Sequence, residues 1–104
     1  MSTGTFMELQ NKPGITIRYC PKCGWLLRAA YMAQELLTTF EEDLSAVSLQ
    51  PAEIAGSYQV LLDQVVLFDR KRDGQFPEIK QLKQTVRDHV NPGKSLGHSD
   101  RKPV

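Results

Sequence analysis

A cysteine pair at the junction of two different hydrophobic patterns is the feature of this sequence that most constrains its fold. In "ITIRY" at 15–19, apolar and polar residues alternate, which is typical of a strand with one buried face. After "CPKCGW" the apolar residues recur every three or four positions, which predicts an amphipathic helix from about residue 23 to 43. The pattern therefore places Cys20 and Cys23 between a strand and the start of a helix.

The rest of the chain shows four further segments of regular pattern. Residues 45–49 form a short strand candidate, and "SYQVLLD" and "VVLFDR" are typical of two strands joined through Asp63 and Gln64. A two-residue connection implies a tight antiparallel hairpin, and one of these two residues is then expected to carry a positive φ. Apolar residues at helical spacing predict a second helix, with Pro77 in its first turn and its end near "NPG" at 91–93.

These elements follow in the order β-α-β-β-β-α, which predicts an α/β (α+β) fold with a four-stranded mixed sheet and two helices. The first three elements form a βαβ unit with parallel strands, and the patterns do not decide whether both helices lie on one face of the sheet. The 104 residues suit one domain. We expect it to span 14–91, with a flexible leader at 1–13 and a polar tail at 92–104.

Charge and hydropathy exclude several classes of protein. The chain has 13 basic and 12 acidic residues, whereas nucleic-acid-binding proteins usually have a strong basic excess. No run approaches the roughly 18 apolar residues that a membrane-spanning helix needs. The first 14 residues lack the pattern of a secretory signal, so we expect a cytoplasmic protein. Stable structural disulfides are rare in that compartment, where a CxxC pair is more often catalytic or metal-binding.

The position of the cysteine pair favours redox chemistry. The thiolate is the form of cysteine that attacks a disulfide, and a helix N-terminus stabilises a thiolate through its unpaired N–H groups and partial positive charge. The basic residues Lys22 and Arg28 lie nearby in the sequence. A CxxC pair between a strand and a helix is a thioredoxin-like motif. We therefore predict that Cys20 and Cys23 are catalytic.

Two other roles for the cysteines stay open. A structural zinc site needs about four ligands, and beyond the two cysteines the chain offers only His89 and His98, far downstream and without the usual ligand spacing. Zinc would therefore require a distant geometry or a second subunit. A purely structural disulfide is the other alternative, which a reducing compartment disfavours.

Three segments of the sequence resemble the selenoprotein W-like (Rdx) family. They are "YCPKCGWLLRAAYMAQELL", "GSYQVLLD" and "VVLFDRKRDGQFPEIKQLKQTVRD", and the resemblance extends from about residue 15 to 99. The chain is similar to bacterial members that carry cysteine throughout. The resemblance implies a thioredoxin-like fold and thiol-based redox work without a bound cofactor. It also implies glutathione as a co-substrate.

The resemblance leaves the roles of the two cysteines in conflict. Selenocysteine in selenium-bearing relatives occupies the second motif position, here Cys23, which implies an attacking group there. Thioredoxin chemistry assigns attack to the first position, here Cys20, which we also expect to be exposed at the tip of the loop. The sequence thus favours, by a narrow margin, Cys20 as the attacking and Cys23 as the resolving residue.

Residues around the motif have functional and ordinary interpretations. Pro21 and Lys22 either tune the redox potential or simply form a solvated turn. The basic run at 70–72 could attract acidic partners or glutathione carboxylates, although a solvated turn is the favoured interpretation. Trp25, and separately Phe76 with Pro77, are candidates for docking a partner. The favoured alternative for Trp25 is packing as a half-buried aromatic, and for Phe76 with Pro77 it is anchoring and starting a helix.

The favoured function is a small thiol–disulfide oxidoreductase in cell redox homeostasis, with glutathione or a thiol-containing protein as its partner. We expect neither a bound cofactor or metal nor a nucleic-acid or membrane partner. The alternative is a redox-regulated protein-binding module without turnover. The sequence identifies neither the physiological substrate nor the oligomeric state.

Overall fold

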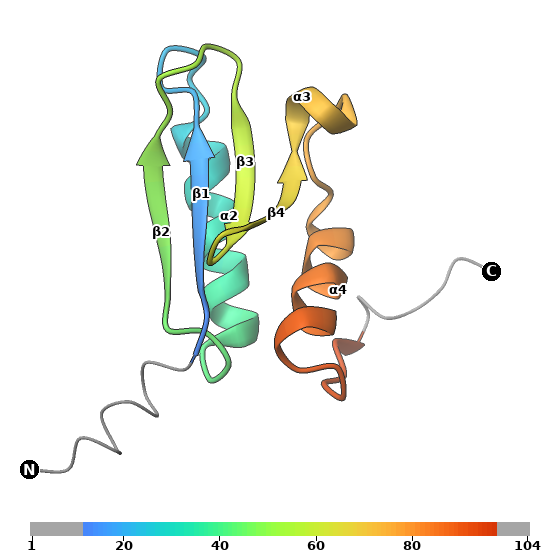
Figure 1. Cartoon of the computed structure of the whole chain (residues 1–104). Helices are drawn as coiled ribbons and strands as arrows, with labels where there is room; N and C mark the ends of the chain where they lie inside the picture. Colours follow the sequence, from blue (N-terminus) through green and yellow to red (C-terminus); the bar gives the residue numbers. More distant parts are fainter. Residues whose placement is uncertain (1–11, 98–104) are drawn as a thin grey trace, which may run out of the picture.

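The computed structural model describes residues 12–97, and its principal elements follow the predicted order. Figure 1 shows these elements along the chain. The strands are β1 (Gly14–Tyr19), β2 (Ala46–Pro51), β3 (Tyr58–Leu62) and β4 (Val65–Asp69), and the helices are α2 (Leu26–Phe40), α3 (Arg70–Asp73) and α4 (Ile79–Val90). Most of the predicted leader and tail lies outside the described residues.

The four strands form one mixed sheet in the order β2-β1-β3-β4. β1 pairs with β2 in parallel and with β3 antiparallel, and β3 pairs antiparallel with β4. This topology confirms the predicted βαβ unit followed by a hairpin. The turn residue Asp63 has φ 51°, as predicted for this connection, and its carboxylate accepts a hydrogen bond of 3.0 Å from the Gly14 backbone N–H.

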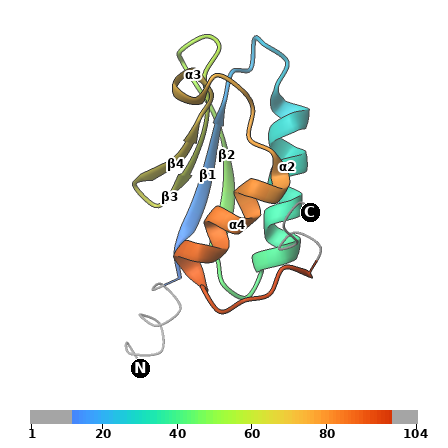
Figure 2. The ribbon, with the colours of Figure 1, turned by 90° about the vertical axis from the view of Figure 1, so that its right-hand side faces the viewer.

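Helices α2 and α4 cover the same face of the sheet (Figure 2). The sequence left this point open. Alternate residues of β1 and β3 point toward both helices and form the core with the apolar face of α2 and two residues of α4. Its members are Ile15, Ile17, Tyr19, Ala29, Met32, Ala33, Leu36, Phe40, Leu44, Tyr58, Val60, Leu62, Leu82 and Val86. None of the helices in residues 12–97 is long and apolar enough to cross a membrane.

Three boundaries differ from the prediction. Helix α2 begins at Leu26 rather than near residue 23, because Gly24 has φ +75° and interrupts the helical path. It ends at Phe40, so the acidic residues 41–43 follow the helix instead of forming its last turn. Pro77 precedes α4 and its N-cap residue Glu78, rather than lying in the first turn.

The charged segment after β4 is a one-turn helix, α3, rather than a plain turn. Asp69 caps it by accepting a hydrogen bond of 3.0 Å from the Lys71 backbone N–H. Gly74, in the left-handed conformation with φ 80°, ends it. In Figure 1, α3 and the turn between β1 and α2 lie at the same end of the molecule. The fold thus brings the basic segment to the cysteine end of the sheet.

Candidate active site

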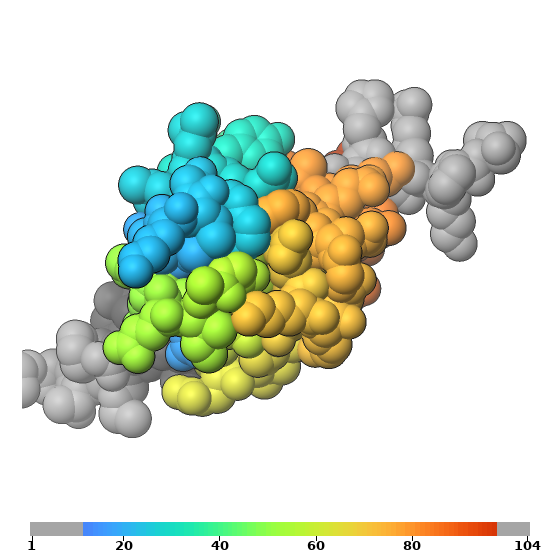
Figure 3. Space-filling view, turned by 90° about the horizontal axis from the view of Figure 1, so that it is seen from above, coloured from blue at the N-terminus to red at the C-terminus, as the bar shows by residue number. Residues whose placement is uncertain are grey.

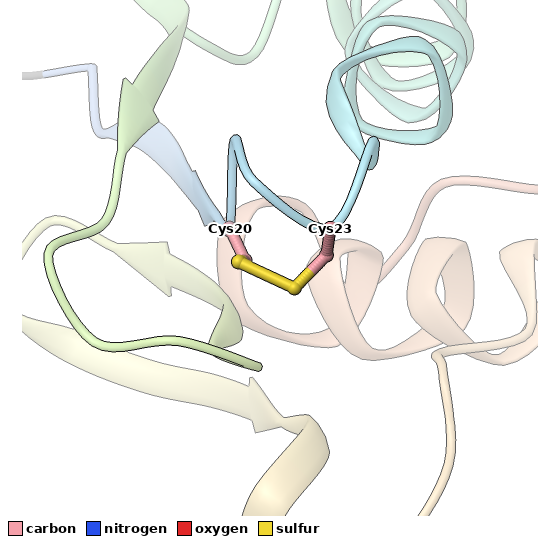
Figure 4. Close-up of a disulfide and its surroundings, with 2 residues drawn as sticks. All are labelled: Cys20 and Cys23. Carbon is pink, nitrogen blue, oxygen red and sulfur yellow. A yellow bond between two sulfur atoms is a disulfide. The ribbon is translucent and has the colours of Figure 1, made fainter.

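Cys20 and Cys23 lie in the turn that connects the end of β1 with the start of α2 (Figure 4). They are joined as a disulfide, with their Cα atoms 5.3 Å apart. The Gly24 backbone N–H donates a hydrogen bond of 3.1 Å to the Pro21 carbonyl, which closes the turn between the two cysteines. Both Pro21 and Lys22 are exposed.

The two cysteines differ sharply in exposure. Cys20 is 2% exposed, because it directly follows Tyr19 at the end of the central strand β1. Cys23 is exposed. The expectation that Cys20 would be the exposed residue at the loop tip is therefore wrong. The positive φ of Gly24 turns the chain directly after Cys23.

Cys23 precedes a helix start that has free hydrogen-bond donors. It lies three residues before Leu26, the first residue of α2. The N-cap residue Trp25 makes no side-chain capping hydrogen bond, and the first backbone bond of the helix runs from the Ala29 N–H to the Trp25 carbonyl, at 3.0 Å. The earlier N–H groups therefore lie at the positive end of the helix dipole, next to the exposed cysteine.

Three aromatic rings pack together beside the cysteine turn. The ring of Phe76 lies 4.8 Å from Trp25 and 5.2 Å from Tyr58 between centroids, and Trp25 and Tyr58 are 6.2 Å apart. All three pairs are edge-to-face, the arrangement that aromatic quadrupoles favour. Trp25 and Phe76 are half-buried and pack against the core, and Pro77 is buried. We call the rings of Trp25, Tyr58 and Phe76 the aromatic cluster.

Two arginines lie over the aromatic cluster. The Arg28 guanidinium carbon is 3.9 Å from the centroid of Phe76, and that of Arg70 is 5.0 Å from Phe76 and 4.9 Å from Trp25. Cations at such distances are attracted by the ring face. Arg70 belongs to the basic run that the sequence assigned to a solvated turn, and the structure instead packs it against the rings.

Tyr58 is the buried member of the aromatic cluster, with 0% exposure. Its hydroxyl donates to the Met32 sulfur at 3.4 Å. Burial raises the pKa of Tyr58 to about 12, while the positive charge of Arg28 acts in the opposite direction. Tyr58 therefore stays protonated at neutral pH.

The sequence did not identify Tyr58 as part of the site. Its position follows from the sheet register, in which Tyr58 pairs with Tyr19, the residue before Cys20. An aromatic residue at the start of β3 was visible in the sequence. Placing it beside the cysteines requires knowing how β1 and β3 pair.

The described residues show no grouping of metal ligands. Between residues 12 and 97, no three His, Cys, Asp or Glu side chains come together in a way that could hold a metal ion. His89 is exposed, and its Nδ1 lies 2.8 Å from the Thr85 carbonyl within α4. His98 lies outside the described residues.

Comparison with known proteins identifies the family. The Rdx family model matches residues 14–88. A crystal structure of a protein from Bordetella parapertussis is 52% identical, with a TM-score of 0.74, and the match covers 77% of this chain and 100% of that one. A crystal structure of a selenoprotein W-related protein from Vibrio cholerae is 44% identical, with a TM-score of 0.74, and covers 78% and 100%. A search among curated proteins finds no match. The cysteine turn, the sheet topology and these similarities together show that the chain is a bacterial, selenoprotein W-like member of the Rdx family.

Proposed function

We propose that this protein is a thiol–disulfide oxidoreductase in which Cys23 attacks and Cys20 resolves. The difference in exposure carries the proposal: Cys23 is exposed before a helix start, whereas Cys20 is 2% exposed. An external disulfide needs access to the attacking sulfur. This assignment reverses the one favoured from the sequence, and it agrees with the position of selenocysteine that the family resemblance implies.

The reaction is an exchange of two electrons between the cysteine pair and a partner. The Cys23 thiolate attacks one sulfur of a partner disulfide, forms a mixed disulfide and releases the other partner sulfur as a thiolate. Cys20 then loses its proton and attacks the Cys23 sulfur, which forms the Cys20–Cys23 disulfide and releases the second partner thiol. Two external thiols, such as two glutathione molecules, reduce the pair again and become a disulfide themselves.

The surroundings of Cys23 support its role as a thiolate. The uncapped start of α2 contributes partial positive charge. Lys22 is its neighbour in the turn, and Arg28 follows in the first turn of α2. Positive groups and helix N-termini lower the pKa of a cysteine thiol. A reducing compartment such as the cytoplasm, with glutathione as co-substrate, fits this chemistry.

A purely structural role for the disulfide has weaker support. The bridge joins residues three apart in the sequence. Closing so short a loop removes little entropy from the unfolded chain, roughly 2 kcal/mol in the chain-entropy model. A core of fourteen buried residues already connects β1 to α2. The fold therefore has little need for a stabilising disulfide at this position.

The test uses two serine variants and oxidised glutathione. Cys20→Ser keeps the exposed attacking residue and lacks the resolving one, so we expect it to accumulate a mixed disulfide that intact-mass spectrometry detects. Cys23→Ser retains only the buried sulfur and should react much more slowly. The proposal fails if neither variant forms a mixed disulfide and the wild-type pair shows no redox equilibrium. The opposite pattern would keep the activity but reverse the two roles.

A redox-regulated binding module without turnover is the second candidate. Its support is the exposed apolar surface beside Cys23, where Leu26 is 50%, Leu27 81% and Tyr31 52% exposed. A coupled assay with glutathione, glutathione reductase and a small disulfide substrate separates the candidates. Sustained turnover that requires Cys23 supports the oxidoreductase. Partner binding that depends on the redox state, without turnover, supports the module.

A further inference from the structure

Two guanidinium groups beside the cysteine turn have no anionic partner in the described part of the chain. Arg28 and Arg70 make no hydrogen bond or ion pair with residues 12–97 through their side chains, and both lie within 5.0 Å of the centre of the Phe76 ring. The Nε atom of Arg70 is buried without a hydrogen-bond partner. A buried donor left unpaired is unfavourable, and the described residues supply this atom with no acceptor.

The carboxylates next to Arg70 are already engaged elsewhere. Asp69 accepts hydrogen bonds from the Gln59 side chain at 3.1 Å and from the Lys71 backbone at 3.0 Å. Asp73 binds the guanidinium of Arg72, with Nε to Oδ1 at 2.9 Å, and accepts from the Asp69 backbone at 3.1 Å. These hydrogen bonds hold the pKa of both carboxyl groups below their usual range. The local acids therefore neutralise Arg72 and cap α3, and they leave Arg70 unpaired.

An exposed apolar depression adjoins the same site. It has a volume of about 550 Å³ and is lined by Gly24, Trp25, Leu27, Arg28 and Tyr31. Arg28 thus lines this depression and also lies over the aromatic cluster. Figure 3 views this end of the molecule, where the cysteine turn (blue) lies between the start of α2 (cyan) and the loop after β2 (green), beside the α3 segment (orange). Glutathione is a small polar molecule and would leave Leu27 and Tyr31 uncovered, whereas a protein segment can cover them.

We propose that Arg28 and Arg70 bind a carboxylate that flanks the reactive cysteine of a partner protein. This inference rests on the proposed function and names its substrate class: a protein thiol or disulfide in a segment with an acidic and an apolar side chain. The acidic side chain lies against the two guanidinium groups, which match the planar geometry of a carboxylate. The apolar side chain occupies the depression lined by Leu27 and Tyr31. The partner cysteine then faces Cys23.

The experiment measures how fast peptide thiols reduce the oxidised protein. One peptide carries its cysteine between glutamates and a leucine, and a matched peptide has glutamines instead. The ratio of the two rates is compared among wild type, Arg28→Gln, Arg70→Gln and the double variant. Comparing this ratio between proteins cancels the intrinsic difference in reactivity between the two peptide thiols. We expect each single variant to lower the ratio by about fivefold, which corresponds to an ion pair at a partly exposed site.

A control variant separates a specific contact from a general effect of charge. Arg72→Gln removes the same charge from the same short helix, but Arg72 is paired with Asp73, so the ratio should stay unchanged. Equal ratios in all proteins, or an equal loss in Arg72→Gln, would overturn the proposal. Glutathione serves as a third thiol in the same assay. The proposal would also be overturned if the wild type reacted faster with glutathione than with either peptide, lost that preference in the arginine variants, and reacted with the two peptides at equal rates.

Dithiothreitol separates this inference from the proposed function. It is an uncharged thiol reagent, so the variants should be reduced by it at the wild-type rate. A wild-type protein that dithiothreitol reduces normally but that treats both peptides alike refutes the carboxylate site and leaves the redox function standing. Arg70→Lys retains the charge but lacks the planar fork, and an intermediate ratio is expected for it. A wild-type ratio in this variant would show that the charge alone suffices and would contradict the two-arginine geometry.

Discussion

Replacing Phe76 tests whether the aromatic cluster holds the cysteine end of the fold together. Phe76→Leu keeps an apolar side chain of similar volume and removes two edge-to-face contacts, at 4.8 and 5.2 Å, and two cation contacts, at 3.9 and 5.0 Å. Each ring pair contributes about 0.5–1.5 kcal/mol and each cation about 0.5–1 kcal/mol at exposed sites. Because Phe76 is half-exposed and leucine restores some contact, we expect a loss of about 2 kcal/mol in the free energy of unfolding.

Two further variants calibrate this value. Phe76→Ala also removes the apolar contacts, so its loss should reach about 3 kcal/mol, near the lower end for a buried phenylalanine. Phe68→Leu is the matched control, because Phe68 is likewise half-buried against the core and has no aromatic or cation contact with the described residues. For this volume-conserving change we expect a loss below about 1.5 kcal/mol.

The assay is urea unfolding of the reduced protein at neutral pH, so that disulfide exchange does not distort the equilibrium. Circular dichroism follows the whole fold, and the fluorescence of the single tryptophan, Trp25, follows the aromatic cluster. If Phe76→Leu destabilises the protein no more than Phe68→Leu does, then the ring and cation contacts contribute nothing beyond apolar burial.

Two further outcomes concern stability. Asp63 combines a φ of 51° with a carboxylate that accepts a hydrogen bond from the Gly14 N–H. The free energy of unfolding in urea should therefore stay within about 0.5 kcal/mol of wild type for Asp63→Asn and fall by about 1–2 kcal/mol for Asp63→Ala. Equal values for the two variants would contradict this role of the side chain. Tyr58 ionises at about pH 12 when folded and near pH 10 when unfolded, so the unfolded state releases its proton first and stability falls as pH rises from 10 to 12. Tyr58→Phe should show a shallower fall over that range, and an identical slope would argue against the burial of the hydroxyl.

Local patterns in the sequence predicted the elements of this fold well. The alternation at 15–19 and the helical spacing after Cys23 each lie within one element, so no knowledge of the rest of the chain was needed. The start of α2 was placed too early, because apolar spacing does not report the positive φ of Gly24. The exposure of the two cysteines depends on how the end of β1 packs in the folded chain, and the sequence could not supply it.

The surroundings of the cysteines were harder to predict, because they depend on contacts between distant segments. Trp25 and Phe76 were each considered for docking, but only the folded chain brings them within 4.8 Å of each other. Arg70 was assigned to a solvated turn, since charged residues near a glycine usually form one. Its position over Trp25 follows from the one-turn helix after β4. A segment of four residues is too short to show a helical period in the sequence.

The burial of Cys20 has a consequence for kinetics under the proposed exchange. The Cys20 sulfur reaches the mixed disulfide at Cys23 from within the same chain, so displacement of the partner by Cys20 needs no second molecule. That displacement is a first-order process, and its rate is set by small movements of four residues rather than by collision. The rate of this displacement should therefore be independent of how much partner is present, and mutations that stiffen the turn between the two cysteines should slow it.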